Sequence, residues 1–165
     1  MINEQYALAT ANLKGRLFVP YQRDGVRWML GMEGQTSGPK GGFLCDEMGL
    51  GKTVQLISVM LGNPRDRTLI IVPKSIITQW RDELTKFAPQ VSVHVYDGPD
   101  RTIDKHAKVT IAPYTLLSDR KSDTTPLHRV LCDRFMLDEA HAIRNTHSKT
   151  SRSVSALRTE RTWVV

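Results

Sequence analysis

The residues best suited to chemistry lie in two short segments of this 165-residue sequence. The first segment, FLCDEMGLGKT at 43–53, combines glycines with Lys52 and Thr53. Glycines let backbone N–H groups turn toward an anion, a lysine can reach the β- and γ-phosphates, and a threonine hydroxyl can hold Mg²⁺. The usual spacing, G-x-x-x-x-G-K-[ST], has a glycine where this chain has Asp46. A plain glycine-rich turn is therefore the alternative interpretation.

The second segment, FMLDEAH at 135–141, follows an apolar stretch with two acids. If that stretch is a strand, Asp138 and Glu139 lie at the carboxyl end of a sheet, where open parallel sheets bind their ligands. Asp138 could hold Mg²⁺, usually through water, and Glu139 could accept a proton from an attacking water. An acidic cap on a following helix is the alternative for this segment alone. Together, the two segments predict a site for a nucleoside triphosphate.

The elements that must position these segments alternate between strands and helices. Continuous or alternating apolar stretches predict strands, and apolar residues at helical spacing predict helices. The predicted strands are at 42–45, 68–72, 91–96, 108–112, 134–138 and 161–165. The predicted helices are at 20–30, 52–61, 75–88, 125–132 and 148–157, with a loop at 31–42 and no strong pattern before residue 20. This order predicts an α/β domain whose sheet is mostly parallel and covered by helices on both faces.

Composition narrows the class of protein. With 40% hydrophobic and 24% charged residues, the chain is expected to be one soluble globular domain. No apolar run approaches the roughly 20 residues of a membrane span, and the N-terminus lacks the pattern of a secretory signal. A formal net charge of +6 permits a nucleic-acid partner, although the basic residues are scattered. The apolar segment at 161–165 is typical of a central strand, so we expect the chain to be cut from a longer protein.

The cysteines and histidines predict no further chemistry. Cys45 and Cys132 both lie in apolar stretches, which predicts buried thiols in a reducing compartment, with Cys45 as a small core residue. The five histidines show no spacing typical of zinc ligands.

The sequence DEMGLGKT followed by DEAH resembles the Swi/Snf-type DNA-dependent ATPases of helicase superfamily two. In that family an acid at the position of Asp46 is normal, so the resemblance identifies the first segment as a phosphate-binding loop without the first glycine. It implies an N-terminal RecA-like ATPase lobe at 17–165, after an extension at 1–16, and a second RecA-like lobe as its partner. The ATP-binding residues it implies are Gln22, Asp46, Glu47, Met48, Gly49, Leu50, Gly51, Lys52 and Thr53.

Further segments carry the resemblance. PYQRDGVRWM is similar to the family's adenine-recognition segment, in which Gln22 would read the base. IIVPKSIITQWRDE and TIAPYTLL resemble segments that face the DNA backbone. The DNA contacts they imply are Lys74, Ser75, Tyr114 and Thr115. His141 would couple the ATP site to the motif that follows, and Trp80 is interpreted as a core residue first.

The resemblance also implies an activity. The complete protein would hydrolyse ATP with Mg²⁺ and move along double-stranded DNA through phosphate contacts, with nucleosomes or another DNA-bound protein as further partners. Lys52 and Glu139 would be catalytic, and Thr53 and Asp138 would hold the metal. We expect a nuclear protein, with a bacterial cytoplasm or a viral replication compartment as alternatives, and no membrane partner. The chain alone should be nearly inactive, because related motors take a catalytic arginine from the second lobe.

Two other functions stay open at this stage. An RNA helicase of the same superfamily shares the residues DEAH, although DEMGLGKT and PYQRDG argue against it. A non-catalytic nucleotide-binding scaffold would keep the fold without the chemistry. The presence of Lys52, Thr53, Asp138 and Glu139 argues against that second alternative.

Overall fold

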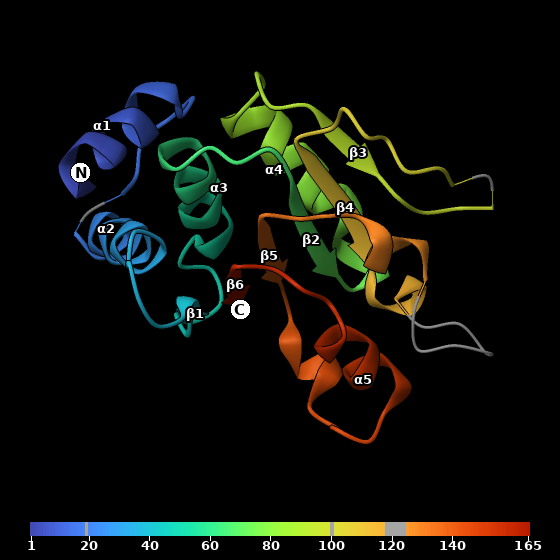
Figure 1. Ribbon diagram of the computed structural model, residues 1–165. Coiled ribbons are helices and arrows are strands. Elements are labelled where there is room, and N and C mark those ends of the chain that lie inside the picture. Colours follow the sequence, from blue (N-terminus) through green and yellow to red (C-terminus); the bar gives the residue numbers. More distant parts are fainter. Residues whose placement is uncertain (19, 100, 118–124) are drawn as a thin grey trace.

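The computed structural model describes residues 1–18, 20–99, 101–117 and 125–165. Within them, six strands form one sheet in the order β1-β6-β5-β2-β4-β3 (Figure 1). The strands are β1 (Lys40–Phe43), β2 (Thr68–Val72), β3 (Val93–Val95), β4 (Val109–Pro113), β5 (Arg134–Leu137) and β6 (Arg161–Val164). Every pairing is parallel. All strands therefore end at one edge of the sheet, the carboxyl edge, and begin at the opposite one, the amino edge.

Helices cover both faces of this sheet. They are α1 (Ile2–Asn12), α2 (Tyr21–Glu33), α3 (Lys52–Gly62), α4 (Ile77–Phe87) and α5 (Lys149–Ser155). The helices α2, α3 and α4 lie over one face, with α1 packed outside on α2 and α3, whereas α5 belongs to the other face (Figure 1). Alternate residues of β2 serve the two sides: Ile70 and Val72 join one apolar cluster, and Leu69 and Ile71 join the other. The predicted α/β class, the parallel sheet and its two covered faces are confirmed.

The central helices form where their residue patterns predict them. Every residue of α3 from Val54 to Gly62 is buried, as expected of a helix that is apolar nearly all round and packs on a sheet. In α4 the buried residues are Ile77, Trp80 and Leu84, whereas the charged residues Arg81 and Asp82 are exposed. The amphipathic stripe of α4 thus turns Trp80 toward the sheet.

Two predicted boundaries shift. The predicted loop at 31–42 is shorter, because α2 continues to Glu33 and β1 begins at Lys40. The helix predicted at 125–132 is wrong beyond its first turn, since only the 3-10 helix η3 (Pro126–Arg129) forms. The main chain becomes extended at Val130, and the N–H of Asp133 then donates to the carbonyl of Arg67. The approach of the chain to β5 therefore ends the helix.

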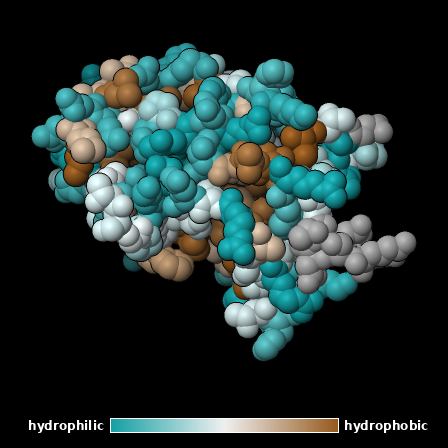
Figure 2. Space-filling view, viewed as in Figure 1, coloured by the Kyte–Doolittle hydropathy of each residue, from teal (hydrophilic) through white to brown (hydrophobic). Residues whose placement is uncertain are grey.

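The helix α1 was not predicted, because its apolar residues form no single stripe. Ile2 and Leu8 are 45% and 43% exposed, and Ala9 is the one buried residue of the helix. Over α1, hydrophilic and hydrophobic residues are mixed on the surface (Figure 2). The helix packs by close approach instead: a Cβ added to Gly62 of α3 would lie 2.6 Å from the carbonyl oxygen of Gln5. The division into an extension at 1–16 and a lobe at 17–165 stays a prediction.

The prediction of two buried thiols is wrong for Cys45, which is exposed. Leu44 is buried and its N–H donates to the carbonyl of Val164, so the next residue points away from the core. Cys132 is half-buried, and burial raises its pKa to about 11. In the described part of the chain, no helix is long and apolar enough to cross a membrane.

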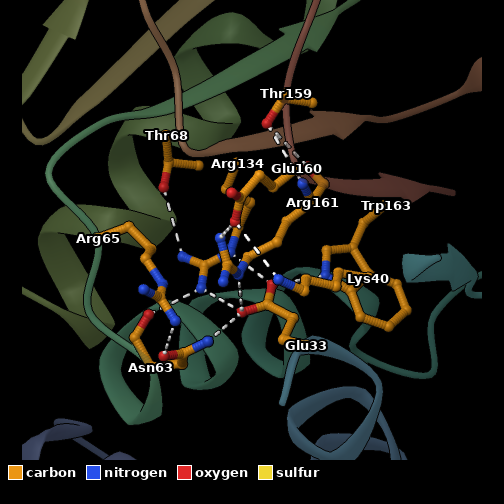
Figure 3. A network of polar contacts seen from close by, with 10 residues as sticks. All are labelled: Glu33, Lys40, Asn63, Arg65, Thr68, Arg134, Thr159, Glu160, Arg161 and Trp163. Carbon is orange, nitrogen blue, oxygen red and sulfur yellow. Dashed lines mark hydrogen bonds and ion pairs between the residues drawn. The ribbon is translucent and has the colours of Figure 1, made fainter. Parts of the chain in front are cut away.

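A buried polar network lies at the amino edge (Figure 3). The carboxylate of Glu33, at the end of α2, accepts hydrogen bonds from Arg134 Nε at 2.6 Å, Asn63 Nδ2 at 2.6 Å and Trp163 Nε1 at 2.8 Å. The side chains of Glu33 and Arg134 are fully buried. Arg134 also donates to the carbonyl of Asn63 and to the hydroxyl of Thr68. The network joins the ends of α2 and α3 to the starts of β2, β5 and β6.

Candidate active site

The loop between β1 and α3 has the backbone shape of a phosphate-binding loop. Gly49 and Gly51 have φ angles of 85° and 75°, in the left-handed region that favours glycine. A Cβ on Gly51 would also lie 2.5 Å from Gln22 Nε2. The loop leads directly into the N-terminus of α3, where free N–H groups and the helix dipole favour an anion.

Asp46 ties this loop to α3 by two hydrogen bonds. Its main-chain carbonyl accepts a hydrogen bond from Lys52 Nζ at 2.6 Å, and its carboxylate accepts one from Gln55 Nε2 at 2.8 Å. The amide of Gln55 lies against α2, where a Cβ on Gly25 would come within 2.2 Å of Gln55 Oε1. An aspartate in place of the usual glycine thus gives the loop a second attachment to α3. Sequence reasoning did not identify Gln55 or Gly25.

Gln22 ties the segment before α2 to the same loop. Its Oε1 accepts a hydrogen bond from the N–H of Phe18 at 2.6 Å, and its Nε2 donates to the carbonyl of Leu50 at 2.9 Å. The side chain is 4% exposed. Both of these contacts are to backbone groups, and the reading of adenine by Gln22 stays a prediction.

The acidic pair lies at the same edge of the sheet, separated from the loop by β6. The N–H of Leu44, just after β1, donates to the carbonyl of Val164 at 2.8 Å. On the other side, the N–H of Val165 donates to Leu137 at 2.8 Å, and the N–H of Ala140 donates to Val165 at 2.9 Å. The end of β6 therefore connects the two segments that the sequence predicts to act together.

Asp138 is held at four points. Its N–H donates to the carbonyl of Ile71 at 3.0 Å. Its carboxylate accepts hydrogen bonds from Trp80 Nε1 at 2.7 Å and from the N–H of Glu139 at 2.9 Å. Its carbonyl accepts one from the Tyr114 hydroxyl at 3.0 Å. The core position predicted for Trp80 is correct, since it is 1% exposed, but sequence reasoning missed its bond to Asp138.

Glu139 is held differently from its neighbour. With φ 54° and ψ 47°, it has a left-handed backbone, and among described residues it is the one non-glycine residue with positive φ. Such backbone strain is common at functional sites. Its side chain is 43% exposed, and His141 Nδ1 lies 3.0 Å from Glu139 Oε2. The carboxylate is therefore accessible to water, with the predicted coupling residue beside it.

The predicted DNA contacts follow β2 and β4 at the carboxyl edge. Lys74, Ser75 and Thr115 are exposed, and Lys74 Nζ lies 3.3 Å from a carboxylate oxygen of Asp97. Tyr114 is instead buried, which does not fit a DNA contact by its side chain. Burial raises the pKa of the Tyr114 hydroxyl, and the carboxylates of Asp138 and Glu139 raise it further. The hydroxyl therefore stays a neutral hydrogen-bond donor.

The donor atoms of the site fit Mg²⁺. Mg²⁺ takes oxygen ligands and usually keeps several waters, with one or two carboxylates and the substrate phosphates completing its shell. The Thr53 hydroxyl and the Asp138 carboxylate are donors of this kind. In the residues that the structure describes, no group of three or more His, Cys, Asp or Glu could hold a metal. A magnesium ion shared with a nucleotide needs no such group.

Comparisons with known proteins agree with this geometry. The family model for the SNF2-related domain matches residues 21–165. The ATP-dependent helicase rhp16 of Schizosaccharomyces pombe is 34% identical over 166 residues, which cover 87% of this chain and 19% of rhp16. An uncharacterized ATP-dependent helicase of Mycoplasma pneumoniae is 34% identical over 148 residues, 84% of this chain and 14% of that protein.

A solved structure is similar over most of the chain. The SWI2/SNF2 ATPase core of Sulfolobus solfataricus in complex with dsDNA matches with a TM-score of 0.79 and 31% identity, covering 93% of this chain and 32% of that one. The chain thus spans less than a fifth of the two curated relatives and about a third of the solved core. Its fold is the RecA-like fold of such a core, and the chain belongs to the family of SNF2-related domains.

Proposed function

We propose that this chain is the first, ATP-binding lobe of a Swi/Snf-like motor that hydrolyses ATP and moves along double-stranded DNA. One observation carries the proposal: the glycine loop with Lys52 and the acidic pair meet at the carboxyl edge, on either side of β6. A scaffold that had lost the chemistry would not need both. The relatives named as ATP-dependent helicases support ATP as the ligand.

The residues divide the work at this edge. The loop N–H groups and the N-terminus of α3 receive the phosphates, and Lys52 exchanges the carbonyl of Asp46 for phosphate oxygens. Thr53 and Asp138 would hold Mg²⁺, whose charge would neutralise the phosphates. Glu139 orients the attacking water and accepts its proton. His141 lies beside Glu139 and couples the ATP site to the motif that follows in the complete motor.

The partners we propose are double-stranded DNA and a second RecA-like lobe of the same protein. Support for DNA comes from the relative whose core was solved in complex with dsDNA and from the exposed positions of Lys74, Ser75 and Thr115. Nucleosomes or another DNA-bound protein are the proposed substrate of the complete motor. Relatives occur in fission yeast and in Mycoplasma, so a nuclear location applies to a eukaryotic source.

Calorimetric titration of ATP tests the nucleotide site. Lys52→Ala removes the charge that binds the phosphates, and a bond to a charged group contributes about 1.5–3 kcal/mol. ATP affinity should therefore fall roughly 10- to 100-fold, whereas the unfolding midpoint stays nearly unchanged because Lys52 is half-buried at a loop-helix junction. Lys108→Ala, at the amino edge, is the control and should bind ATP normally. Equal affinity of both variants would refute the phosphate-loop assignment.

Duplex binding tests the proposed partner. DNA and RNA duplexes of equal length and several sequences are titrated at rising salt. Contacts to phosphates predict affinity for DNA that falls with salt and varies little with base sequence. A preference for duplex RNA would favour the RNA helicase instead, and affinity independent of salt would contradict both.

A further inference from the structure

We propose that Trp80 and Tyr114 are positioning residues for Asp138, through which the two segments with predicted DNA contacts control how the site holds its metal. The inference rests on the proposed function, because it concerns Asp138 as a magnesium-holding acid. It concerns neither direct contact with the nucleotide nor direct contact with DNA.

The bond from Trp80 sets the direction of the carboxylate. Trp80 Nε1 donates to Asp138 Oδ2 at 2.7 Å, and the N–H of Glu139 donates to Asp138 Oδ1 at 2.9 Å. Both oxygens are thus fixed, and each keeps lone pairs for a metal or a metal-bound water. Side chains that hydrogen-bond a metal-holding group orient it, and their removal typically lowers metal affinity roughly 10- to 100-fold.

The bond from Tyr114 sets the main chain at the same residue. The Tyr114 hydroxyl donates to the carbonyl of Asp138 at 3.0 Å. That carbonyl belongs to the peptide that joins Asp138 to Glu139, whose backbone is left-handed. Tyr114 therefore holds the peptide from which the accessible carboxylate of Glu139 projects.

Each of these two side chains comes from a segment with predicted DNA contacts. Trp80 lies on α4, which continues directly from the 3-10 helix η1 (Lys74–Ile76). Tyr114 opens the 3-10 helix η2 (Tyr114–Leu116), next to the exposed Thr115. DNA that shifts either segment would move a side chain bonded to Asp138. By linkage, a bound metal nucleotide would then change DNA affinity by the same factor.

A purely structural role makes a different prediction. Buried tryptophans usually find a partner for their N–H, and Asp138 could serve only as that partner. In that case the loss of the N–H lowers the free energy of unfolding but leaves the magnesium dependence of nucleotide binding unchanged.

The test compares Trp80→Phe with Trp28→Phe in binding of ATP at varied Mg²⁺ and in EDTA. Trp28 is 45% exposed and lies edge-on to Trp163, so it gives the same substitution without a bond to Asp138. We expect Trp80→Phe to raise the Mg²⁺ concentration for half-maximal tightening of ATP binding roughly 10- to 100-fold, while its ATP affinity in EDTA stays within about twofold of wild type. Tyr114→Phe should shift it in the same direction by less, and Trp28→Phe should leave it unchanged.

A second measurement needs no tryptophan variant and covers the case in which Trp80→Phe does not fold. The wild-type chain is labelled with ¹⁵N and its tryptophan indole N–H signals are recorded by NMR. The indole signal that is displaced in Asp138→Asn is assigned to Trp80. This signal should move on addition of ATP with Mg²⁺ but not with ATP in EDTA.

The outcomes separate the inference from the proposed function. Wild-type magnesium dependence in Trp80→Phe, or an indole signal indifferent to Mg²⁺, would overturn the inference while leaving the ATP site intact. A wild-type chain that binds no ATP under either condition would refute the proposed function, and the inference with it.

Discussion

The two edges of the sheet hold their charged groups in opposite ways. At the amino edge, Glu33 and Arg134 are fully buried, and the carboxylate of Glu33 is bonded by Arg134, Asn63 and Trp163 (Figure 3). At the carboxyl edge, Glu139 is 43% exposed, and its partner in the described structure is the exposed His141. Lys52, also at that edge, is half-buried, and among the described residues its side chain bonds the main-chain carbonyl of Asp46.

This difference separates groups that hold the fold from groups that can act on a ligand. A buried carboxylate bonded on all sides can neither move nor accept a new partner without leaving a buried charge uncompensated. A half-exposed group with a backbone partner can exchange that partner for a phosphate or a water at little cost. Asp138 is the intermediate case, because it is part-buried and bonded but keeps free lone pairs.

The largest loss of unfolding free energy is expected from a variant that breaks the amino-edge network. Arg134→Met removes the bonded cation and leaves the buried Glu33 carboxylate with only the more distant Arg161 Nε, 4.0 Å from Oε2; breaking a buried pair typically costs about 3–5 kcal/mol. Urea unfolding followed by circular dichroism measures the loss. Lys108→Ala, which breaks the exposed and solvent-screened pair with Asp66, should leave the unfolding free energy nearly unchanged and is the control.

A double variant sharpens the interpretation. Glu33→Gln combined with Arg134→Met removes both charges and keeps one oxygen acceptor, for either Trp163, which bonds Oε1, or Asn63, which bonds Oε2. Its unfolding free energy should lie above that of Arg134→Met alone, because no buried carboxylate is left without its bonded cation and Arg161 keeps its pair with Glu160. A single variant that loses less than about 1 kcal/mol would mean that the two edges do not differ in this way.

The sequence predicted the carboxyl edge better than the amino edge for a physical reason. Lys52 and Asp138 are recognisable from local patterns, because Lys52 comes at the end of a glycine-containing loop before a helix and Asp138 follows an apolar stretch. Glu33 and Arg134 are 101 positions apart, and each looks like a solvated residue flanking an element. Their pairing depends on how α2 packs beside β5, which no local pattern contains.

The same limit applies within the site. The core position of Trp80 followed from helical spacing, but its bond to Asp138, 58 positions away, did not. Cys45 was assigned to the core by its apolar neighbours, whereas it is exposed, two residues after β1 ends. Local spacing predicts which face of an element is buried, and it does not predict which buried polar groups meet.

The second effect, of intermediate size, tests the attachment of the phosphate loop to α2. A Cβ on Gly25 would come within 2.2 Å of Gln55 Oε1 and displace the amide that holds Asp46. Gly25→Ala should therefore destabilise the chain by about 1–3 kcal/mol, as overpacking usually does, and weaken ATP binding.

The matched control lies on the same helix. At Gly31 the nearest atom to an added Cβ is 3.4 Å away, at the end of the Ile2 side chain. Gly31→Ala should stabilise α2 by roughly 0.5–1 kcal/mol, since alanine is the better helix former. If both variants behaved alike in thermal unfolding and ATP titration, contact between α2 and the loop would not matter for the site.

The smallest expected effect is the contribution of Glu33 to the pH dependence of the unfolding free energy. Burial alone would raise the pKa of Glu33, but hydrogen bonding and the charge of Arg134, with hydrogen bonds from Trp163 and Asn63, hold its pKa below the ordinary 4.5. A carboxyl group with a depressed folded-state pKa stabilises the fold above its unfolded pKa. That stability is lost as the pH falls through the folded value.

The unfolding free energy should therefore be insensitive to Glu33 near neutral pH and decline below about pH 4.5, by at most about 1.4 kcal/mol per pH unit for one proton. Exposed acids also titrate there, so the measured quantity is the difference between wild type and Glu33→Gln at each pH. That difference should shrink as the pH falls from 4.5, because the protonated glutamate comes to resemble glutamine. A difference constant from pH 7 to pH 3 would show that Glu33 takes up no proton on unfolding in this range. The amino edge would then be stabilised by packing rather than by its ion pair.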